Sequence, residues 1–403
     1  MTPGRCETDR RNSLMGNARM PEPATALDHE STIVAVVELS ARSWLVGAQV
    51  AGVPRQCRQK LAPSAEGLLD HLDHLRQRAE KAGKRVSRVV VAYEAGRDGF
   101  WLARWLLGRG IEVYVIQPSS VPVDRRARRA KTDALDVEML LRTTLAWLRE
   151  EPRVCSMVPI PSEVEEDGRR PSRERQDLIR ERLALTNKID GVLATLGVGG
   201  YRPLRRDRRE RLEALRRPGG DPLPAHAKAR LARLLDRLEL VLEQIGVLEE
   251  ARDAVVARDA VPGGEADSLI RRLAGLKGIG PELATLLAWE AFVRPFRDRR
   301  ALAAYAGLTG TPFDSGDRRR EQGIGKAGNR RLRAALVELA WLWLRYQPDS
   351  ALAAWFRRRT QAAGGRTRKV MIVALARKLF VALWRFCRDG TIPDGAALKT
   401  APA

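Results

Sequence analysis

The chain has 403 residues, of which 44% are hydrophobic, so it is long enough for two or three globular domains and too apolar to be disordered throughout. Its 72 Lys and Arg residues exceed its 50 Asp and Glu residues, and the formal net charge of +22 favours a polyanionic partner such as nucleic acid. The four cysteines lie far apart without CxxC spacing, which argues against a zinc ribbon and against a disulfide-rich secreted domain.

The two ends of the chain give no sign of a membrane protein. Residues 1–30 are polar, contain Pro and Gly, and lack the apolar core of a signal peptide, so they predict a disordered extension. The most apolar late segment, VMIVALARKLFVALWRF, is interrupted by three basic residues and predicts a buried helix rather than a membrane span. We expect a cytoplasmic protein.

Residues 31–150 predict a mixed α/β domain. The runs STIVAVVELS and SWLVGAQVAG predict a hairpin of two strands, and SRVVVAYE and IEVYVIQP predict two buried strands. Apolar residues at helical spacing predict helices in SAEGLLDHLDHLRQRAEKAG, which Ser64 caps, in DGFWLARWLLGRG and in AKTDALDVEMLLRTTLAW. A hairpin followed by alternating helices and strands is typical of ribonuclease-H-like (RuvC-like) folds.

A linker and a helical region follow. Residues 151–172 are rich in Pro, Ser, Glu and Gly and predict a linker, and residues 173–260 predict helices. In the second of these helices, alternating spacings of three and four form the seam of a coiled coil or a helical hairpin: Leu231, Leu234, Leu238, Val241, Ile245 and Leu248. Packing within one chain and packing between two chains are both open.

Residues 266–395 predict a second, mostly α-helical globular domain. The segment LAGLKGIGPELATLLAWEAF has helix–Gly-x-Gly–helix form, like a helix-hairpin-helix element. Its Gly278 and Gly280 are able to expose backbone N–H groups to a phosphate, although the same pattern also serves plain helix packing. A short helix at 300–306, a loop that carries Ser315, and two or three apolar helices complete this domain.

Four acids in the first domain are candidate metal ligands. Glu38 and Glu94 end two predicted strands, and Asp133 and Asp136 are three residues apart on one predicted helix, so they share a face. Carboxylate oxygens are preferred by Mg²⁺, and two such ions clamp both sides of a phosphodiester. Taken alone, Glu38 and Glu94 are explained as ordinary charges at strand ends, and Asp133 is explained as a partner for Lys131. Their joint placement favours a magnesium site.

The segment around Ser315 is the candidate catalytic element of the second domain. Asp-Ser-Gly is common turn chemistry, so a plain surface turn is the simple alternative to a nucleophile. Histidines occur only at positions 29, 71, 74 and 226, so a histidine-based triad is not indicated. The candidates for holding nucleic-acid phosphates, which are otherwise a solvated basic surface, are Lys131, Arg318, Arg319, Arg320, Lys326, Asn329, Arg330 and Arg333.

These residues resemble a known family. VVELS, AYEAG and AKTDALDVEML resemble the N-terminal Asp-Glu-Asp-Asp domain of the DEDD-type insertion-sequence transposases, which are described as bridge-RNA-guided recombinases. LKGIGPELATLLAWE and AYAGLTGTPFDSGDRRREQGIGKAGNRRLRAALVELAW resemble the C-terminal transposase domain of that family. The two separated motif sets occur in the family's order and cover nearly the whole chain after residue 30.

The resemblance implies a mechanism. Ser315 matches the serine that attacks a DNA phosphodiester and becomes covalently linked to DNA, and the four acids match the Mg²⁺ ligands, which a different protomer supplies. Glu38 stands where the family has Asp, so its carboxylate reaches one methylene farther. The implied partners are donor DNA, target DNA, a structured non-coding guide RNA, and further copies of the chain in a dimer or a synaptic tetramer.

Two other functions fit the same residues. A RuvC-like structure-specific endonuclease uses four acids with water as the nucleophile, but it leaves the Ser315 segment unexplained. An inactive nucleic-acid-binding relative is mildly favoured by Glu38 and disfavoured by the intact Ser-Gly segment.

Overall fold

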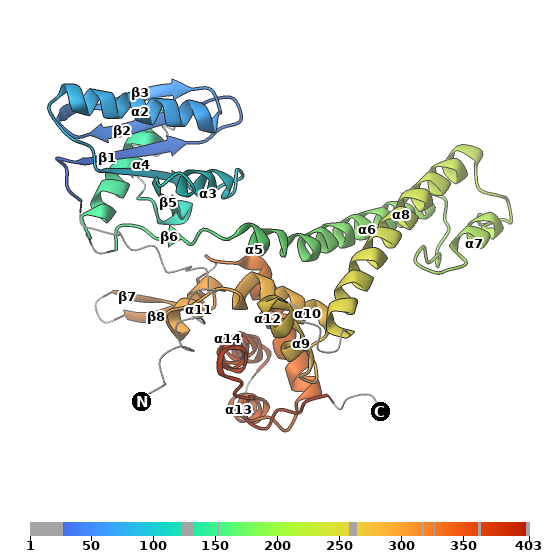
Figure 1. Ribbon diagram of the computed structural model, residues 1–403. Helices are drawn as coiled ribbons and strands as arrows, with labels where there is room; N and C mark the ends of the chain where they lie inside the picture. Colours follow the sequence, from blue (N-terminus) through green and yellow to red (C-terminus); the bar gives the residue numbers. More distant parts are fainter. Residues whose placement is uncertain are drawn as a thin grey trace, which may run out of the picture. The chain divides into compact units, whose positions relative to one another are not determined.

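The structure is a computed structural model that describes residues 27–122, 133–151, 153–257, 264–315, 318–325, 327–361 and 364–399, with backbone only at 314–315 and 318–322. The chain divides into two compact units, and the boundary along the sequence falls between Glu163 and Val164. Most of the predicted N-terminal extension, together with Lys131 and Lys326, lies outside the described residues. Figure 1 shows the elements of both units, coloured along the sequence.

The first unit is built on a mixed sheet, as predicted, and this sheet has six strands. Its spatial order is β3-β2-β1-β4-β5-β6, in which β1, β4 and β5 run parallel and the other strands pair antiparallel. The strand bounds are β1 Thr32–Glu38, β2 Trp44–Val50, β3 Val53–Leu61, β4 Arg88–Glu94, β5 Glu112–Ile116 and β6 Met157–Val158. The β-branched runs of β1 and β4 form the buried centre of this sheet, because they are apolar on both faces.

Helices cover both faces of the sheet. One core joins the sheet to α2 (Ala65–Lys81) and α3 (Trp101–Leu107), and a second core on the opposite face joins it to α4 (Asp133–Leu148). A short 3₁₀ turn, η1 (Pro118–Ser120), follows β5. The predicted cap of α2 is confirmed, since the Ser64 hydroxyl accepts a hydrogen bond from the Gly67 N–H at 3.1 Å.

The predicted linker contains regular structure. Within residues 151–172 the chain forms β6, which pairs with β5, and then α5 (Glu163–Asp167). The signal for β6 is weak because its apolar pair stands among Pro, Ser and Glu, yet Met157 is buried in the core on the α4 side of the sheet. The boundary between the two units falls inside this segment.

The helical region forms a long arm in the second unit. Helices α6 (Arg170–Ala194) and α8 (Ala225–Ala257) run side by side, with α7 (Arg208–Ala214) near their far end (Figure 1). The predicted seam of α8 packs against α6 of the same chain, because the seam residues and Leu178, Leu185, Ile189 and Leu193 share one core. The seam is therefore covered within one chain.

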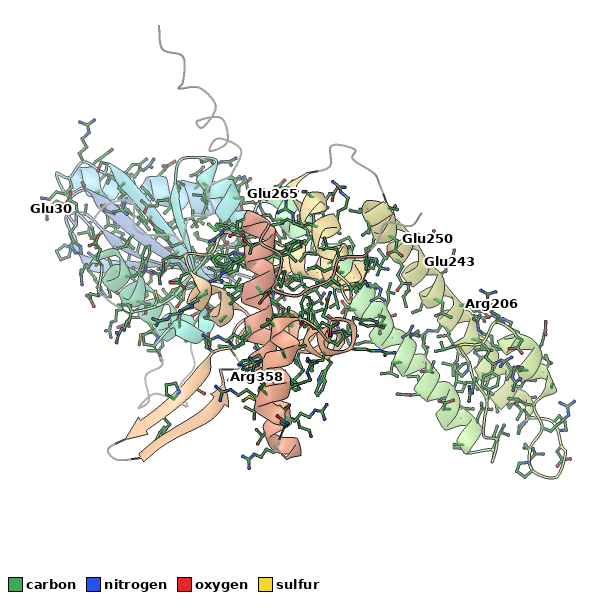
Figure 2. The ribbon with its side chains drawn as sticks, turned by 90° about the horizontal axis from the view of Figure 1, so that it is seen from below. Glu30, Arg206, Glu243, Glu250, Glu265 and Arg358 are labelled. Carbon is green, nitrogen blue, oxygen red and sulfur yellow. The ribbon has the colours of Figure 1, made fainter. Side chains whose placement is uncertain are left out.

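The rest of the second unit is a helical domain from which a β-hairpin projects (Figures 1 and 2). Its elements are α9 (Glu265–Ala274), α10 (Pro281–Leu287), a π-helical turn η2 (Ala288–Phe292), α11 (Arg299–Tyr305), β7 (Gly310–Ser315), β8 (Arg318–Ile324), α12 (Arg330–Tyr346), α13 (Ala351–Thr360) and α14 (Gly365–Asp389). The described helices include none that is both long enough and apolar enough to cross a membrane.

Two details of this domain refine the sequence analysis. The prediction of a loop at Ser315 is wrong, because the segment forms the β7–β8 hairpin. Polar and charged residues fill both strands, so no alternating apolar pattern announced them. At the α9–α10 turn, Gly278 has φ +86 and a Cβ there would lie 3.0 Å from Tyr346, which favours the plain packing role of that glycine.

Gly47 allows α4 to sit close to the sheet, and we expect Gly47→Ala to destabilise the protein. An added Cβ would lie 2.3 Å from Val137 Cγ1, so α4 must shift. Overpacking of this kind costs about 1–3 kcal/mol in the free energy of unfolding, which urea titration followed by circular dichroism measures. Gly67→Ala is the control, since its Cβ meets nothing nearer than 3.6 Å and the change raises helix propensity. Equal losses in both variants would contradict the close approach of α4.

Candidate active site and nucleic-acid interface

Two of the candidate acids end neighbouring parallel strands. The register pairs Val37 of β1 with Tyr93 of β4, so Glu38 and Glu94 follow at the same level, as the last residues of their strands. Both are half-buried. The carboxyl ends of parallel strands share one edge of a sheet, which is where α/β folds usually bind ligands. The sheet therefore brings these two glutamates next to one another.

Both glutamates belong to the face of the sheet that α4 covers. Side chains alternate along a strand, and Val36 and Ala92, each two residues before its glutamate, are buried in the core formed with α4. Helices α2 and α3 pack on the opposite face. The remaining two candidate acids are carried by α4 itself, so all four belong to one side of the sheet.

The α4 acids lie near the end of β1. Asp133 and Asp136 occupy the first turn of α4, where Asp133 is exposed and Asp136 half-buried. The next residue, Val137, packs over Gly47, which pairs with Val36 two residues before Glu38. Within the described ranges, however, no three His, Cys, Asp or Glu residues are close enough to hold a metal ion. The fold collects the four acids on one side without closing a ligand cage.

The backbone register of the hairpin decides which residues accompany Ser315. Ser315 ends β7 opposite Arg318, and Phe313 lies opposite Arg320. Because alternate residues of a strand occupy opposite faces and directly paired residues share a face, positions 313, 315, 318 and 320 belong to one face of the ribbon. Asp314 and Arg319 are paired on the other face. Ser315 is thus grouped with two of the three consecutive arginines.

The base of the hairpin is held by close backbone contacts. The Asn329 N–H donates to the Tyr305 carbonyl at 2.7 Å. Gly307 and Gly328 have φ of +65 and +92, and a Cβ would lie 2.1 Å from the Ala327 carbonyl at the first and 2.5 Å from the Tyr305 carbonyl at the second. Only glycine fits at either position. The chain entering the hairpin and the chain leaving it are therefore fastened together.

Asn329 links this base to the helical body. Its Oδ1 accepts from the Leu332 N–H at 3.0 Å and so caps α12. Its Nδ2 donates to Glu290 Oε2 at 2.9 Å and lies 3.3 Å from the Tyr305 hydroxyl. With the backbone bond described above, this side chain holds α11, α12 and η2 in fixed relation to the hairpin.

Glu290 is the buried charge at the centre of this arrangement. It is 2% exposed and lies in η2, a π-helical turn of the kind often found at functional sites. The carboxylate accepts two hydrogen bonds from the guanidinium of Arg173 in α6, at 2.9 and 3.0 Å. Burial raises the pKa of Glu290, but the hydrogen bonds and charge of Arg173, together with the Asn329 amide, outweigh it and hold the pKa below its ordinary value.

The predicted phosphate-binding residues that the structure describes fall into three groups. Arg330 is exposed at the first position of α12. Asn329 has the internal partners just described, and Arg333 Nη1 donates to the carbonyls of Ala306 and Ala327. Arg318, Arg319 and Arg320 are described by their backbone alone, within β8. Structural positioning therefore accounts for Asn329 and in part for Arg333.

Three residues of this region were not predicted as part of a site. Glu290 and Arg173 form the buried pair, and the available signal was a lone acid in the apolar run TLLAWEAF. Phe313 is 50% exposed on the hairpin strand that ends at Ser315.

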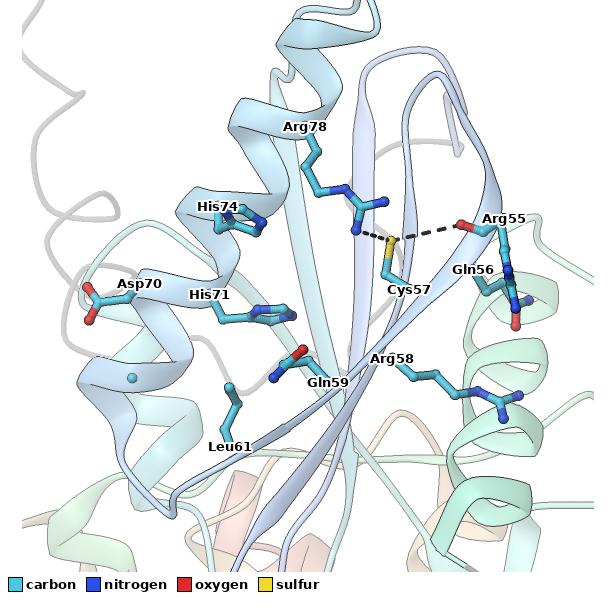
Figure 3. Close-up of a pocket in the computed structure, with 11 residues that line it drawn as sticks. Arg55, Gln56, Cys57, Arg58, Gln59, Leu61, Asp70, His71, His74 and Arg78 are labelled. Atoms are coloured by element: carbon cyan, nitrogen blue, oxygen red, sulfur yellow. Dashed lines mark hydrogen bonds between the residues drawn. The ribbon is translucent and has the colours of Figure 1, made fainter.

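The groove in Figure 3 lies apart from the acids. It has a volume of about 550 Å³ between α2 and the edge strand β3. His71 and Arg78 of α2 face Cys57 and Gln59 of β3, and Arg78 Nη1 donates to Cys57 Sγ at 3.1 Å. Burial, followed by the charges of His74 and Arg78, lowers the pKa of His71. This groove is on the α2 face of the sheet, opposite the face of Glu38 and Glu94, so it is not part of the acidic edge.

Comparison with known proteins identifies the family. Residues 270–354 match the model of the transposase IS116/IS110/IS902 family, and residues 57–197 match a transposase model of the DEDD type of IS110 elements. The chain is 46% identical, over 96% of its length and all of the relative's, to the Sinorhizobium fredii protein y4rJ, which bears the name of a transposase. The chain belongs to the IS110/IS116 transposase family.

More distant relatives agree with this assignment. A Pseudomonas aeruginosa protein named for a family 20 transposase is 31% identical over 73% of the chain and 82% of its own length. The transposase for insertion sequence element IS1328 of Yersinia enterocolitica is 27% identical over 75% of the chain and 85% of its own length. The α/β sheet unit and the helical C-terminal region are consistent with a DEDD transposase, and the resemblance inferred from the motifs is confirmed at the level of the family.

We expect the Glu290–Arg173 pair to stabilise the second unit in a pH-dependent way. A carboxylate whose folded-state pKa is depressed contributes stability above its unfolded pKa, near 4.5, and this contribution is lost as the pH falls through the folded pKa. Glu290→Gln should therefore cost about 1–3 kcal/mol at neutral pH, less than for a fully buried pair because Arg173 is half exposed. The difference from the wild type should shrink on acidification.

Urea unfolding of both proteins between neutral pH and about pH 3 measures this difference. Glu249→Gln is the matched control, because Glu249 of α8 pairs with Arg175, which lies in α6 as Arg173 does. Glu249 is 36% exposed, so its substitution should lower the free energy of unfolding by less than about 1 kcal/mol. A difference that is independent of pH, or as large in the control, would show that Glu290 is not held as a charged partner.

Proposed function

We propose that this transposase cleaves and rejoins DNA through a covalent intermediate at Ser315. The observation that carries the proposal is the hairpin register, which groups Ser315 with Arg318 and Arg320 on one face of a β-ribbon fixed at its base. A serine that shares one face of a ribbon with two arginines is suited to this role, because arginine holds phosphate oxygens and stabilises their charge in the transition state. The family membership supports a DNA-processing reaction.

The step balances without an external energy source. The serine Oγ forms a bond to phosphorus, the bond from phosphorus to one deoxyribose oxygen breaks, and that oxygen leaves as a hydroxyl, taking up a proton in exchange for the serine proton. The phosphoserine retains the energy of the broken phosphodiester, so attack by a DNA hydroxyl reverses the step and joins strands. This reversibility suits recombination better than hydrolysis.

We propose that Glu38, Glu94, Asp133 and Asp136 hold Mg²⁺. Their carboxylate oxygens are the donors that this ion prefers, and the fold places all four on one side of the sheet. Bound Mg²⁺ would polarise a phosphate oxygen and neutralise developing charge. Because the described acids do not form a closed cage, DNA phosphates or the acids of a second protomer would have to complete the site.

The proposed partners follow from the charge and from the family. Donor and target DNA would bind along basic residues that include Lys131, Arg318, Arg319, Arg320, Lys326, Arg330 and Arg333, in addition to the capping residue Asn329. We propose that a structured non-coding RNA of the element selects both DNAs by base pairing. A composite site formed by the acids of one protomer and Ser315 of another requires at least a dimer, and synapsis of two DNAs requires a tetramer.

A metal-dependent endonuclease is the second candidate. The observation that favours it is the acidic edge, which belongs entirely to the first unit and could act with water as the nucleophile. Trapping of a covalent protein–DNA species separates the two functions, because hydrolysis by water leaves no adduct on the protein.

We expect Ser315→Ala to abolish covalent adducts while DNA binding stays nearly intact. The substitution removes the attacking oxygen and leaves the basic surface unchanged. Denaturing gel electrophoresis of labelled DNA incubated with the protein and Mg²⁺ measures the adduct, and a mobility-shift assay measures binding. Adducts that persist in Ser315→Ala would refute the nucleophile.

The neighbouring arginines supply a matched control for this assignment. Arg318→Ala should slow adduct formation by about two to three orders of magnitude, as expected for the loss of one phosphate donor. Arg319→Ala removes the same charge from the other face of the ribbon and should have a much smaller effect. Equal losses at the two positions would contradict the register argument.

The metal proposal is tested by varying the acid of β1. Glu38→Gln should remove Mg²⁺-dependent strand cleavage, since it deletes a charged ligand while preserving shape, whereas Glu38→Asp should retain measurable cleavage at raised Mg²⁺ because the carboxylate persists. The readout is the Mg²⁺ concentration required for half-maximal cleavage of labelled DNA. If Glu38→Asp abolished cleavage and Glu38→Gln did not, Glu38 would be wrongly assigned.

A further inference from the structure

An open groove of about 660 Å³ begins at the foot of the hairpin and continues along α12. Ile324, the last residue of β8, lies at its start, and the remaining lining comes from one face of α12: Arg330, Arg333, Ala334, Val337, Glu338 and Trp341. These positions follow helical spacing and form a continuous stripe. The stripe is apolar along its floor and carries charged residues at its sides. Arg330 and Arg333 are already among the residues proposed to bind DNA, whereas the apolar residues of this stripe have no role in the function proposed above.

Trp341 is a fixed aromatic surface at one end of this groove. Its ring meets the ring of Phe356 in α13 edge-on, with centroids 6.5 Å apart, and the guanidinium of Arg368 in α14 lies 5.9 Å from its centroid. Although two neighbouring helices hold it, Trp341 is 42% exposed. A large ring that is held in place yet exposed is ready to stack on a flat partner, because little rotamer entropy is lost on binding.

The sequence that follows Glu338, from α12 through α14, is strongly basic. From residue 339 to residue 388 the only acid is Asp349, whereas eleven residues are basic: Arg345, Arg357, Arg358, Arg359, Arg366, Arg368, Lys369, Arg377, Lys378, Arg385 and Arg388. Arg330 is exposed at the end of the groove nearest the hairpin. Glu338 is the single acid of the lining, and a carboxylate there can accept a hydrogen bond from the exocyclic amino group of a base.

We propose that this groove binds an unpaired nucleotide of the DNA strand that Ser315 processes, with its base stacked on Trp341 and its phosphates held by Arg330 and Arg368. The inference deepens the proposed function and rests on it. An apolar floor with an exposed aromatic ring and flanking guanidiniums is the combination by which proteins bind single-stranded nucleic acid. Because the groove starts where β8 ends, a strand bound in it would run along β8, about 20 Å, to reach the end of the hairpin that carries Ser315.

Charge argues against an apolar protein segment as the occupant. A second copy of this chain is itself strongly basic, so it would bring like charge to Arg330 and Arg368. A DNA strand supplies both a flat base that can stack on the exposed ring of Trp341 and negative charge for the arginines. The alternative occupants, RNA and a second copy of the chain, are outcomes of the test below.

Binding of a short single-stranded DNA that carries one 2-aminopurine tests the proposal. The full chain with Ser315→Ala is used, so that no covalent step intervenes. Trp341→Ala should weaken binding by about 5- to 100-fold and reduce the quenching of 2-aminopurine, since it removes one stacked base. The affinity falls as salt rises, and Arg368→Ala should make this fall less steep by about one unit in the slope of log affinity against log salt. Trp341→Ala should leave that slope unchanged.

Two variants separate a binding role from a structural one. Trp341→Phe keeps an aromatic face and should retain most of the affinity. Trp384→Ala removes a tryptophan that also has an arginine over its ring, with Arg388 Cζ 4.7 Å from the centroid, but it does not line the groove, so DNA binding should be unaffected. Equal losses for Trp341→Ala and Trp384→Ala would overturn the proposal.

Two further results would also overturn it. One is a loss of affinity for RNA of the same sequence with none for DNA, and the other is a change in oligomeric mass on sedimentation of Trp341→Ala, which would assign the groove to a second copy of the chain. The two proposals fail on different measurements. The Ser315 nucleophile is refuted if the wild-type protein forms no covalent adduct with DNA. The Trp341 groove is tested by DNA affinity alone, whether or not an adduct forms.

Discussion

A buried carboxylate that must keep its partner organises the second unit. Glu290 is almost fully removed from water, and an ionised carboxylate at such a depth is tolerated only where hydrogen bonds and an opposite charge replace its hydration. Arg173 and Asn329 meet this requirement from two different directions. One belongs to the long helical arm and the other to the exit of the hairpin. The electrostatic demand of one side chain thus connects the α6 helix to the segment that presents Ser315.

The elements that could be predicted from the sequence are those whose own residues favour that secondary structure. Strands β1 and β4 are β-branched runs buried on both faces, α2 has a serine cap, and α8 has an apolar seam, so local pattern and final structure agree. The β7–β8 hairpin is different. Its strands contain arginines and polar residues in place of an alternating apolar face, and its position depends on glycines at its base and on Asn329, which lie outside the strands. A window of sequence cannot reveal an element whose stability comes from elsewhere in the chain.

The candidate site divides along the same line. Glu38 and Glu94 were candidates because each ends a predicted strand. The parallel register of β1 with β4 places these two residues side by side, as expected for the ends of neighbouring strands. Their relation to Asp133 and Asp136 depends on tertiary packing, namely on how closely Val137 of α4 approaches Gly47. The burial of Glu290 and the exposure of Trp341 were beyond prediction for a further reason: a lone acid or a lone tryptophan in a helix carries no sign of its neighbours. Only the assembled helices show that one is buried beside an arginine and that the other is exposed above a groove.

The alternation of the hairpin also limits how this segment can change in length. Gain or loss of a single residue inside one of the paired strands, without a bulge to absorb it, would shift the pairing by one residue, so that Arg319 would replace Arg318 and Arg320 on the face of Ser315. A change of two residues within a strand preserves this alternation. The constraint comes from the geometry of the ribbon rather than from the chemistry of any one residue.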